Sequence, residues 1–324
     1  MFDIVAIGEA LIDFAPSGRN EMGNPLYCQN PGGAPANVLA MASILGSKTS
    51  FIGKVGDDSF GHFLKKAIEN AGVDTKGLIV SRKQNTTLAF VSLSETGDRS
   101  FSFYRDRTAD VMLEEKEIDE SILKGTKIFH FGSVSMTAEP SLSATLYAVK
   151  KAKEYGSTIS FDPNYRPLLW KCREEAKEII TKAVGMCDIL KVSDEELLLI
   201  TDTSDLRKGS EILKSMGPKI VIVTMGENGS YIRTDDYEKK YDAYKVPVVD
   251  TTGAGDAFVG AFLNSLLKLD IITEKTLSLQ PSAWDDIMRF CNAAGSLTTT
   301  QKGAIPAMPG KEKIDSFIKP NIED

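Results

Sequence analysis

The sequence is poor in cysteine and histidine, and this scarcity excludes several kinds of site. Its four cysteines stand at positions 28, 172, 187 and 291 without a Cys-x-x-Cys pair, and there are only two histidines. A zinc site built from cysteine and histidine is therefore not expected. We interpret the cysteines as buried free thiols.

Long apolar runs and an excess of positive charge are also missing. No stretch of about 18 apolar residues is present, as a membrane-spanning helix would require. The N-terminal segment MFDIVAIGEALIDF carries Asp3, Glu9 and Asp13, unlike the apolar core of a signal peptide. The net charge is -7, and no basic stripe offers a surface for nucleic acid. We expect a cytoplasmic protein that binds neither membranes nor nucleic acid.

Three common nucleotide-binding signatures are absent as well. The P-loop pattern GxxxxGK[ST] does not occur, and GEALID follows the first apolar segment where GxGxxG would stand in a dinucleotide-binding fold. The HRD and DFG motifs of protein kinases are also missing. Any nucleotide chemistry must therefore use another loop.

What the sequence does contain is a repeated alternation of short apolar segments with amphipathic ones. We predict strands over residues 2–8, 50–53, 127–131, 158–162, 188–192 and 220–224, and helices over 34–45, 60–71, 141–155 and 174–184. Short apolar strands with helices between them favour a mostly parallel sheet covered on both faces. The 324 residues are expected to form a single domain, 1–324, with a three-layer α/β/α fold.

One segment interrupts this alternation. Residues 87–94 and 99–104, separated by ETGD, have the period of a β-hairpin, with apolar residues on both faces. Residues 11–16 and 26–30 are weaker strand candidates that could join it. A hairpin with two apolar faces packs against something, so we predict a small β-sheet lid formed by residues of about 10–31 and 84–110. The pattern alone leaves a plain surface hairpin equally open.

In the segment DTTGAGDAF, Asp250 to Phe258, the acid Asp256 directly follows two glycines and an alanine, whose side chains are absent or small. The apolar spacing after Asp256 predicts a helix that begins near Gly253–Gly255. Unpaired N–H groups at a helix N-terminus bind anions, and glycines let an anion approach closely. Asp256 could take a proton from a hydroxyl beside this anion hole. The alternative is a first-turn carboxylate that stabilises its own helix.

The segment PGGAPANVLA, residues 31–40, has a similar form near the N-terminus. Gly32 and Gly33 precede a predicted helix whose first turns carry Asn37. The functional interpretation is close approach of the backbone to a polyol whose hydroxyls bond to Asn37. A glycine turn followed by an asparagine in a capping region explains the segment equally simply.

Together these segments resemble the PfkB or ribokinase family of carbohydrate kinases, and the similarity extends over essentially the full length. PGGAPANVLA resembles the N-terminal signature of that family, and DTTGAGDAFVGAF resembles the C-terminal one. FYRDRTADVML (103–113) and FDPNYRPLLW (161–170) resemble fructokinases in particular. The resemblance implies a ribokinase-like fold, with ATP and a sugar as substrates.

The resemblance also implies roles for individual residues in phosphoryl transfer and sugar binding. Asp256 would be the catalytic base, and the backbone of Gly253, Ala254 and Gly255 would form the anion hole. A second set would bind the sugar: Asp13, Gly32, Gly33, Asn37, Arg105 and Asp256. Arg166 would lie near the sugar or the transferred phosphoryl group. Without the family, Asp13 could be a solvated acid at a strand end, and each arginine could be an ordinary surface residue.

For ATP, the family motif NxxE falls on residues 193–196. Glu196 would position Mg²⁺ through water, while Ser193 replaces the usual asparagine and keeps only one hydrogen bond of the amide pair. The strand and turn VTMGENGSY would place Thr224, Gly226 and Gly229 near the phosphates and ribose. Lys191 is implied on the phosphate side, Gly255 at the phosphates, and Asn292 on the adenine side.

A site for a monovalent cation such as K⁺ is implied too. Asp250 and the main chain of Thr252 would meet the carbonyl groups of Thr298 and Gly303, because a hard cation prefers oxygen ligands. Ala307 stands where some relatives have a serine hydroxyl, which would weaken the site. Alternatively, Asp250 only caps its own turn.

The leading expectation is an ATP-dependent fructokinase that dimerises through its lid. The nearest alternative is another sugar kinase of the same fold, above all a 2-keto-3-deoxygluconate kinase, which would need an arginine for the substrate carboxylate. A catalytically silent sugar-binding relative is a third hypothesis. The intact Gly-Ala-Gly-Asp segment argues against it, because a silent relative would be free to lose Asp256.

Overall fold

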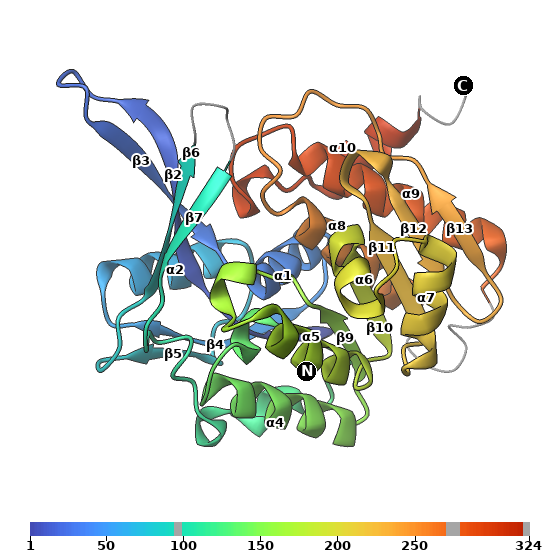
Figure 1. The fold of residues 1–324 in the computed structure, drawn as a ribbon, viewed down its shortest axis with the longest axis horizontal. Coiled ribbons are helices and arrows are strands. Elements are labelled where there is room, and N and C mark those ends of the chain that lie inside the picture. Colours follow the sequence, from blue (N-terminus) through green and yellow to red (C-terminus); the bar gives the residue numbers. More distant parts are fainter. Residues whose placement is uncertain (94–98, 270–278, 320–324) are drawn as a thin grey trace.

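The computed structural model describes residues 1–93, 99–269 and 279–319, and its centre is a large twisted sheet (Figure 1). Within these residues the sheet has nine strands in the order β13-β12-β11-β10-β9-β8-β1-β4-β5. All neighbours pair in parallel except β11–β12 and β12–β13. The strands are β1 Ile4–Ile7, β4 Thr49–Gly56, β5 Leu78–Ser81, β8 Ile128–Gly132, β9 Thr158–Asp162, β10 Ile189–Ser193, β11 Ile220–Thr224, β12 Ser230–Arg233 and β13 Glu238–Tyr241.

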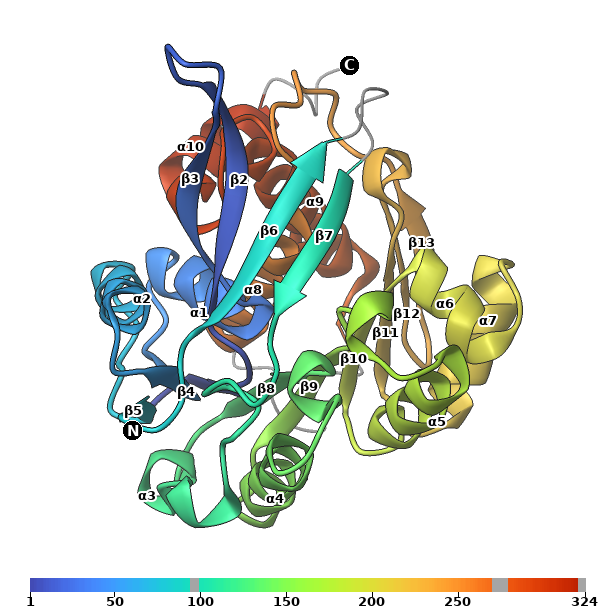
Figure 2. The ribbon, with the colours of Figure 1, turned by 60° about the vertical axis from the view of Figure 1, so that its left-hand side comes forward.

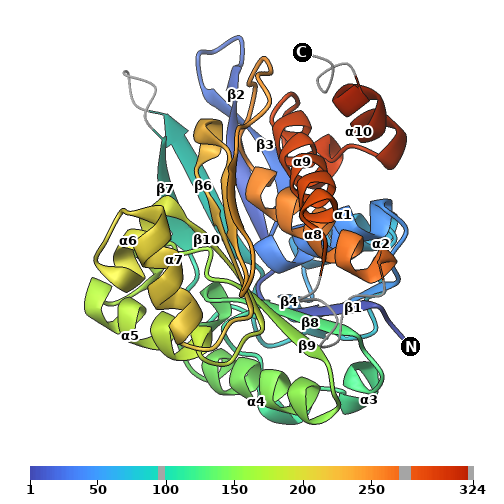
Figure 3. The ribbon, with the colours of Figure 1, turned by 90° about the vertical axis from the view of Figure 1, so that its right-hand side faces the viewer.

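Helices cover both faces of this sheet, as Figure 3 shows in edge view. One face carries α1 Ala34–Ile44, α2 Ser59–Asn70, α8 Ala254–Lys268, α9 Pro281–Thr298 and α10 Lys311–Ile318. The other carries α3 Glu120–Leu123, α4 Ser141–Glu154, α5 Arg173–Val184, α6 Asp194–Thr201 and α7 Leu206–Ser215. The predicted three-layer α/β/α fold with a mostly parallel sheet is confirmed.

The apolar strands explain why two helical layers are needed. Along β1, Ile4 and Ala6 enter the core beneath α1 and α8, whereas Val5 and Ile7 enter the core beneath α4 and α5. All four side chains are fully buried. Because successive residues of a strand point to opposite faces, an uninterrupted apolar strand requires cover on both sides.

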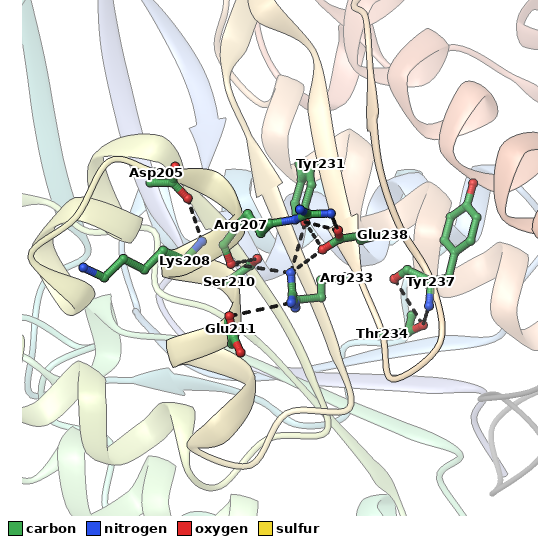
Figure 4. Close-up of polar contacts among 10 residues, drawn as sticks. All are labelled: Asp205, Arg207, Lys208, Ser210, Glu211, Tyr231, Arg233, Thr234, Tyr237 and Glu238. Atoms are coloured by element: carbon green, nitrogen blue, oxygen red, sulfur yellow. Dashed lines mark hydrogen bonds and ion pairs between the residues drawn. The ribbon is translucent and has the colours of Figure 1, made fainter.

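The edge formed by β12 and β13 is fastened to α7 by polar side chains. Figure 4 shows Arg207, Tyr231 and Arg233 converging on Glu238. The Tyr231 hydroxyl donates to Oε2 of Glu238 at 2.8 Å, and Nε of Arg207 donates to Oε1 at 2.7 Å. These charged contacts at an edge also discourage pairing with another chain.

A second, four-stranded sheet stands up from the body of the molecule (Figure 2). Its order is β3-β2-β6-β7, with β2 Leu11–Arg19, β3 Pro25–Gly32, β6 Thr87–Leu93 and β7 Arg99–Tyr104. The weaker strand candidates 11–16 and 26–30 therefore do join the hairpin, by antiparallel pairing of β2 with β3 and parallel pairing of β2 with β6. The ETGD turn lies outside the described residues.

The thiol prediction was wrong for two of the four cysteines. Cys187 and Cys291 are buried, but Cys28 on β3 and Cys172 before α5 are exposed, because both stand on surface segments and not in a core strand or helix. Within the described ranges, no helix has the length and apolarity needed to cross a membrane.

Candidate active site

A cavity of about 710 Å³ lies between the small sheet and the carboxyl ends of the large sheet's strands. In open parallel sheets this edge is where ligands bind. The cavity brings together segments far apart in the sequence: the small sheet, the N-termini of α1 and α8, and the turn after β9. Eleven of the residues predicted for the sugar, the phosphoryl group, ATP or the monovalent cation line it, namely Asp13, Gly33, Asn37, Arg166, Lys191, Asp250, Thr252, Gly253, Gly255, Asp256 and Gly303.

Asp256 lies in the first turn of α8 and faces this cavity. Its Oδ2 accepts a hydrogen bond from Nδ2 of Asn37 at 2.8 Å. Burial raises the pKa of Asp256 to about 6, although the bond from Asn37 lowers it. A carboxylate that is held by one oxygen and has a pKa near neutrality is suited to accept a proton.

The N-terminus of α8 is left open for an anion. Gly253 is the N-cap with φ of 77°, and the helix has no side-chain cap. A Cβ at Gly253 would stand 2.6 Å from Cβ of Ala304, so only glycine fits this left-handed position. Within the described residues, the N–H groups of Gly255 and Asp256 have no acceptor, whereas that of Ala254 donates to the carbonyl of Thr251 at 3.3 Å.

The predicted sugar-binding glycines are required by their surroundings. A Cβ at Gly32 would stand 2.3 Å from Oδ2 of Asp13, and one at Gly33 would stand 2.3 Å from the Glu9 carbonyl oxygen. Gly33 has φ of 122° and is the N-cap of α1. Burial raises the pKa of Asp13 to about 6, while Arg166 lowers it. Gly32 and Gly33 therefore lie in close contact with neighbouring groups near the Asp13 carboxylate, and their role in sugar binding stays a prediction.

Arg105 is bonded to protein groups outside the two cavities. It does not line the cavity. Its Nε donates to Oδ2 of Asp110 at 2.7 Å, and its terminal nitrogens donate to Oγ1 of Thr137 at 2.6 Å and to the Val134 carbonyl at 3.0 Å. The guanidinium fastens the end of β7 to the loop after β8. Contact of Arg105 with the sugar stays a prediction that would require these bonds to rearrange.

A second, smaller cavity of about 340 Å³ adjoins the first. Asn164, Arg166 and Lys191 line both cavities, so the two form one continuous region. The smaller cavity adds Ser193 and Glu196, as predicted for the phosphate side, and Arg173, which the sequence pattern did not indicate.

Glu196 is held by backbone N–H groups. Its Oε1 accepts from Tyr165 at 2.6 Å, and its Oε2 accepts from Ser193 at 2.7 Å. The Ser193 hydroxyl in turn accepts from the Glu196 N–H at 3.1 Å, which completes a capping box on α6. Over the described ranges, no three acidic, histidine or cysteine side chains cluster as a metal site. The role of Glu196 toward Mg²⁺ through water stays a prediction.

The remaining predicted nucleotide residues line neither cavity. Thr224 ends β11 and its hydroxyl donates to the Val192 carbonyl at 3.4 Å. Gly226 and Gly229 have φ of 55° and 85°, and a Cβ at Gly229 would stand 1.9 Å from the Tyr241 carbonyl oxygen. Asn292 is buried in α9, with Nδ2 lacking a partner among the described residues. Their nucleotide roles stay predictions.

The residues predicted for a monovalent cation come together in part. Oδ2 of Asp250 accepts from the Gly303 N–H at 3.0 Å, and Oδ1 accepts from the Thr252 N–H at 3.0 Å. Asp250 therefore caps its own turn and also joins it to the loop that follows α9. Thr298 is the last residue of α9, and both Thr298 and Ala307 are buried. The role of these residues in binding a monovalent cation stays a prediction.

This geometry agrees with what the sequence is similar to. The family described as "pfkB family carbohydrate kinase" matches residues 1–311. The chain belongs to the pfkB family of carbohydrate kinases. It is an ATP-dependent carbohydrate kinase, and the predicted family and fold are confirmed.

Individual relatives of this kinase cover nearly the whole chain. A probable fructokinase-5 of Arabidopsis thaliana is 44% identical over 320 residues, which are 98% of this chain and 97% of that protein. The crystal structure of a fructokinase from Xylella fastidiosa with bound ATP has a TM-score of 0.90 and 31% identity, covering 99% of both chains. A fructokinase double mutant from Vibrio cholerae O395, with bound fructose, ADP and potassium ion, has a TM-score of 0.86 and 33% identity over 98% of both chains.

Three acids near the kinase site were missed in the sequence. Oε1 of Glu9 accepts from the Ala34 N–H at 2.9 Å, and burial raises the pKa of Glu9 to about 7. Asp110 holds Arg105, and Asp162 holds Lys191 with Nζ–Oδ2 of 3.0 Å. Glu9 directly follows the predicted strand 2–8, Asp162 ends the predicted strand 158–162, and Asp110 directly precedes the apolar residues 111–113. The position of an acid beside an apolar segment was the only sequence feature that could have indicated these three residues.

Proposed function

We propose that the protein is a fructokinase, which converts D-fructose and ATP into D-fructose 6-phosphate and ADP. The observation that carries the proposal is the Asp256 carboxylate, bonded to Asn37 at 2.8 Å and placed beside the open N-terminus of α8. The names of the relatives support fructose as the sugar.

The transfer would proceed by in-line displacement at the γ-phosphorus of ATP. Asp256 would accept the proton of the sugar hydroxyl as its oxygen bonds to phosphorus. The bond from phosphorus to the bridging oxygen would break, and ADP would leave with that electron pair. The N–H groups of Gly253, Ala254 and Gly255 would stabilise the charge on the transferred phosphoryl group. Among the described residues the Gly255 N–H has no acceptor, whereas the Ala254 N–H would first have to leave the Thr251 carbonyl.

Binding and the exclusion of water would fall to the residues around the cavity. Asp13, Gly32, Gly33 and Asn37 would hold the sugar hydroxyls, and Arg166 would lie between the sugar and the phosphoryl group. The small sheet, residues of about 10–31 and 84–110, would act as the lid that keeps water from attacking ATP. Mg²⁺ would neutralise phosphate charge, with Glu196 holding one of its waters.

A monovalent cation would sit behind the anion hole. Asp250 and the main chain of Thr252, Thr298 and Gly303 would provide oxygen ligands. The potassium ion bound in the Vibrio cholerae structure supports this assignment. The missing hydroxyl at Ala307 would weaken the site.

The lid also suggests how two copies would associate. Its cavity side carries Asp13, Val91 and Phe103. The opposite side carries Phe14, Phe90 and Tyr104, whose rings contact one another in series at centroid distances of 4.8 and 5.6 Å. Tyr104 is 64% exposed, so this aromatic side would be covered by the lid of a second copy. We place the dimer in the cytoplasm.

The proposal is tested by coupled measurement of ADP release with fructose, 2-keto-3-deoxygluconate, ribose, glucose and fructose 6-phosphate. Fructose should give the highest kcat/KM. A preference for 2-keto-3-deoxygluconate would overturn the fructokinase proposal. ATP binding without turnover of any sugar would overturn catalysis itself.

A further inference from the structure

The ammonium of Lys191 lies against the first turn of α8, and the catalytic step described above uses neither this ammonium nor Asp162, the carboxylate that accepts from it. Asp162 is the last residue of β9, and its side chain is 3% exposed. The isolated burial of a charged carboxylate is strongly unfavourable, so such a group is retained only with partners. Its partners lie on both sides of the phosphoryl site.

The first partner of Asp162 is Lys191 on β10. Nζ of Lys191 donates to Oδ2 of Asp162 at 3.0 Å. A Cβ at Gly255 would stand 3.3 Å from the same Nζ, so the ammonium lies directly against the first turn of α8. Asp162 is the only hydrogen-bond acceptor of this ammonium in the part of the chain that the structure describes. Two of its three N–H donors therefore remain for an anion at the helix N-terminus.

The second partner is the turn that follows β9. Oδ1 of Asp162 accepts from the backbone N–H of Asn164 at 3.2 Å, and Asn164 has φ of 47°, in the left-handed region. The next N–H, that of Tyr165, is held by Glu196 at 2.6 Å. The turn ends at Arg166, which is exposed and lines both cavities. Asp162 and Glu196 thus fix the backbone from which the guanidinium projects.

We propose that Asp162 is a positioning residue for phosphoryl transfer, with one carboxylate oxygen holding the Lys191 ammonium under the N-terminus of α8 and the other fixing the turn that carries Arg166. Lys191 then contacts the transferring phosphoryl group together with the N–H groups of α8. Its positive charge offsets the negative charge that the reaction concentrates there. Asp162 itself touches neither substrate.

The surroundings of Lys191 support a charged side chain. Burial lowers the pKa of Lys191, but the negative charges of Asp162, Glu196 and Asp256 raise it, and their combined effect leaves it above the ordinary value. His130 on β8 also faces the pair, and burial lowers its pKa to about 4, so it adds no charge near neutrality.

This inference rests on the proposed kinase activity and is tested by a double-mutant cycle. The four proteins are the wild type, Asp162→Asn, Lys191→Met and the double variant. Each is assayed for kcat, for KM of ATP and of the sugar that the wild type turns over best, and for its melting temperature. Because Asp162 acts through Lys191, Asp162→Asn should lower kcat about 100-fold and leave the KM of the sugar within about twofold.

The decisive expectation is that the double variant is within about threefold of Lys191→Met alone. The amide of Asp162→Asn keeps one oxygen that can accept from the Asn164 N–H, so the substitution removes mainly the contact with Lys191. A loss equal to the product of the two single losses would overturn the inference. So would a kcat within about threefold of the wild type for Asp162→Asn, or a loss confined to the KM of the sugar.

Folding is controlled with a matched pair elsewhere. Nζ of Lys54 donates to Oε1 of Glu117 at 2.8 Å, and neither residue lines the two cavities. Glu117→Gln removes the acid from a largely buried lysine and should leave kcat unchanged. If Asp162→Asn does not fold, Asp162→Glu takes its place in the cycle, because it keeps the charge and displaces the ammonium.

A wild type that phosphorylates no sugar would overturn the proposed function, whereas an active wild type with independent variants would overturn only this inference.

Discussion

Asn37 and Asp256 are 219 residues apart in the sequence, yet Nδ2 of Asn37 donates to Oδ2 of Asp256 at 2.8 Å. The bond joins the first turns of α1 and α8, which pack side by side. It leaves Oδ1 of Asp256 as the oxygen for a substrate proton. Oδ1 of Asn37 is buried without a partner among the described residues.

Replacement of Asp256 by Asn should remove catalysis and spare nucleotide binding. The amide keeps the size of the side chain but cannot accept the hydroxyl proton. We expect kcat to fall by about 10²–10⁴-fold, while the Kd for ATP changes little. Coupled ADP release and equilibrium binding of ATP measure the two effects. Turnover near that of the wild type would refute the role of Asp256 as base.

The activity of the enzyme should fall in acid. Asp256 must be ionised to accept a proton, and burial raises its pKa to about 6. The value of kcat/KM should therefore be constant at higher pH and fall as the pH drops through about 6. In Asn37→Ala the bond that lowers this pKa is lost, so the acidic limb should move to higher pH. The measurement is kcat/KM from pH 5 to pH 9.

Asp13 provides the control for that profile. Burial also raises its pKa to about 6, and Arg166 opposes this effect. Asp13→Asn should weaken sugar binding but keep an acidic limb that belongs to Asp256. A variant whose kcat/KM no longer falls in acid would assign the limb to Asp13 instead.

Most of the parallel part of the fold was predictable because its strands are apolar on both faces, although β5, which pairs in parallel with β4, was not predicted. The predicted strands 158–162 and 220–224 coincide with β9 and β11. The antiparallel pair β12 and β13 was missed. Strand β13 has the sequence EKKY, and its pairing depends on contacts such as that of Glu238 with Tyr231. A short, charged edge strand carries too little periodicity to be identified alone.

The glycines of the site were predictable because the backbone conformation at their positions requires glycine. Contacts between side chains from distant segments were less predictable. Gly253 and Gly33 stand at positive φ, and the sequence marks both positions. The contact of Arg105 with Asp110 could not be inferred, because nothing in the sequence says which acid a guanidinium will meet. The bond of Lys191 to Asp162 went unnoticed for the same reason. Contact of Arg105 with the sugar was predicted from the family resemblance and stays a prediction.

Replacement of Gly253 by Ala should damage both stability and turnover. The residue has φ of 77°, and the new Cβ would stand 2.6 Å from Cβ of Ala304. We expect a loss of unfolding free energy on the order of 2 kcal/mol and a lower kcat, because the N-terminus of α8 must shift. Gly310→Ala is a matched control, since Gly310 is also an N-cap but has φ of -71° and open space. Equal melting temperatures for the two variants would contradict the expectation.

A charge on the outer side of the lid should separate the proposed dimer. Tyr104→Lys places an ammonium among the rings of Phe90 and its neighbours, where a second lid would bury it at high cost. Sedimentation should show a dimer for the wild type and a monomer for the variant at micromolar concentration. Ile44→Lys, at the end of α1, changes another exposed apolar residue and should remain dimeric. A monomeric wild type would rule out the proposed association.

Glu196→Gln should separate a structural role of this residue from a role in handling Mg²⁺. Both carboxylate oxygens accept backbone N–H groups, from Tyr165 and Ser193, and an amide offers only one acceptor. The variant should lose about 1–3 kcal/mol of unfolding free energy and some turnover, because the turn before Arg166 is released. If Glu196 also holds a water of Mg²⁺, the Mg²⁺ concentration for half-maximal rate should rise and excess Mg²⁺ should restore part of the loss. Thermal unfolding and titration of Mg²⁺ at saturating ATP measure the two effects separately. An unchanged melting temperature of the variant would show that the two backbone contacts do not stabilise the fold.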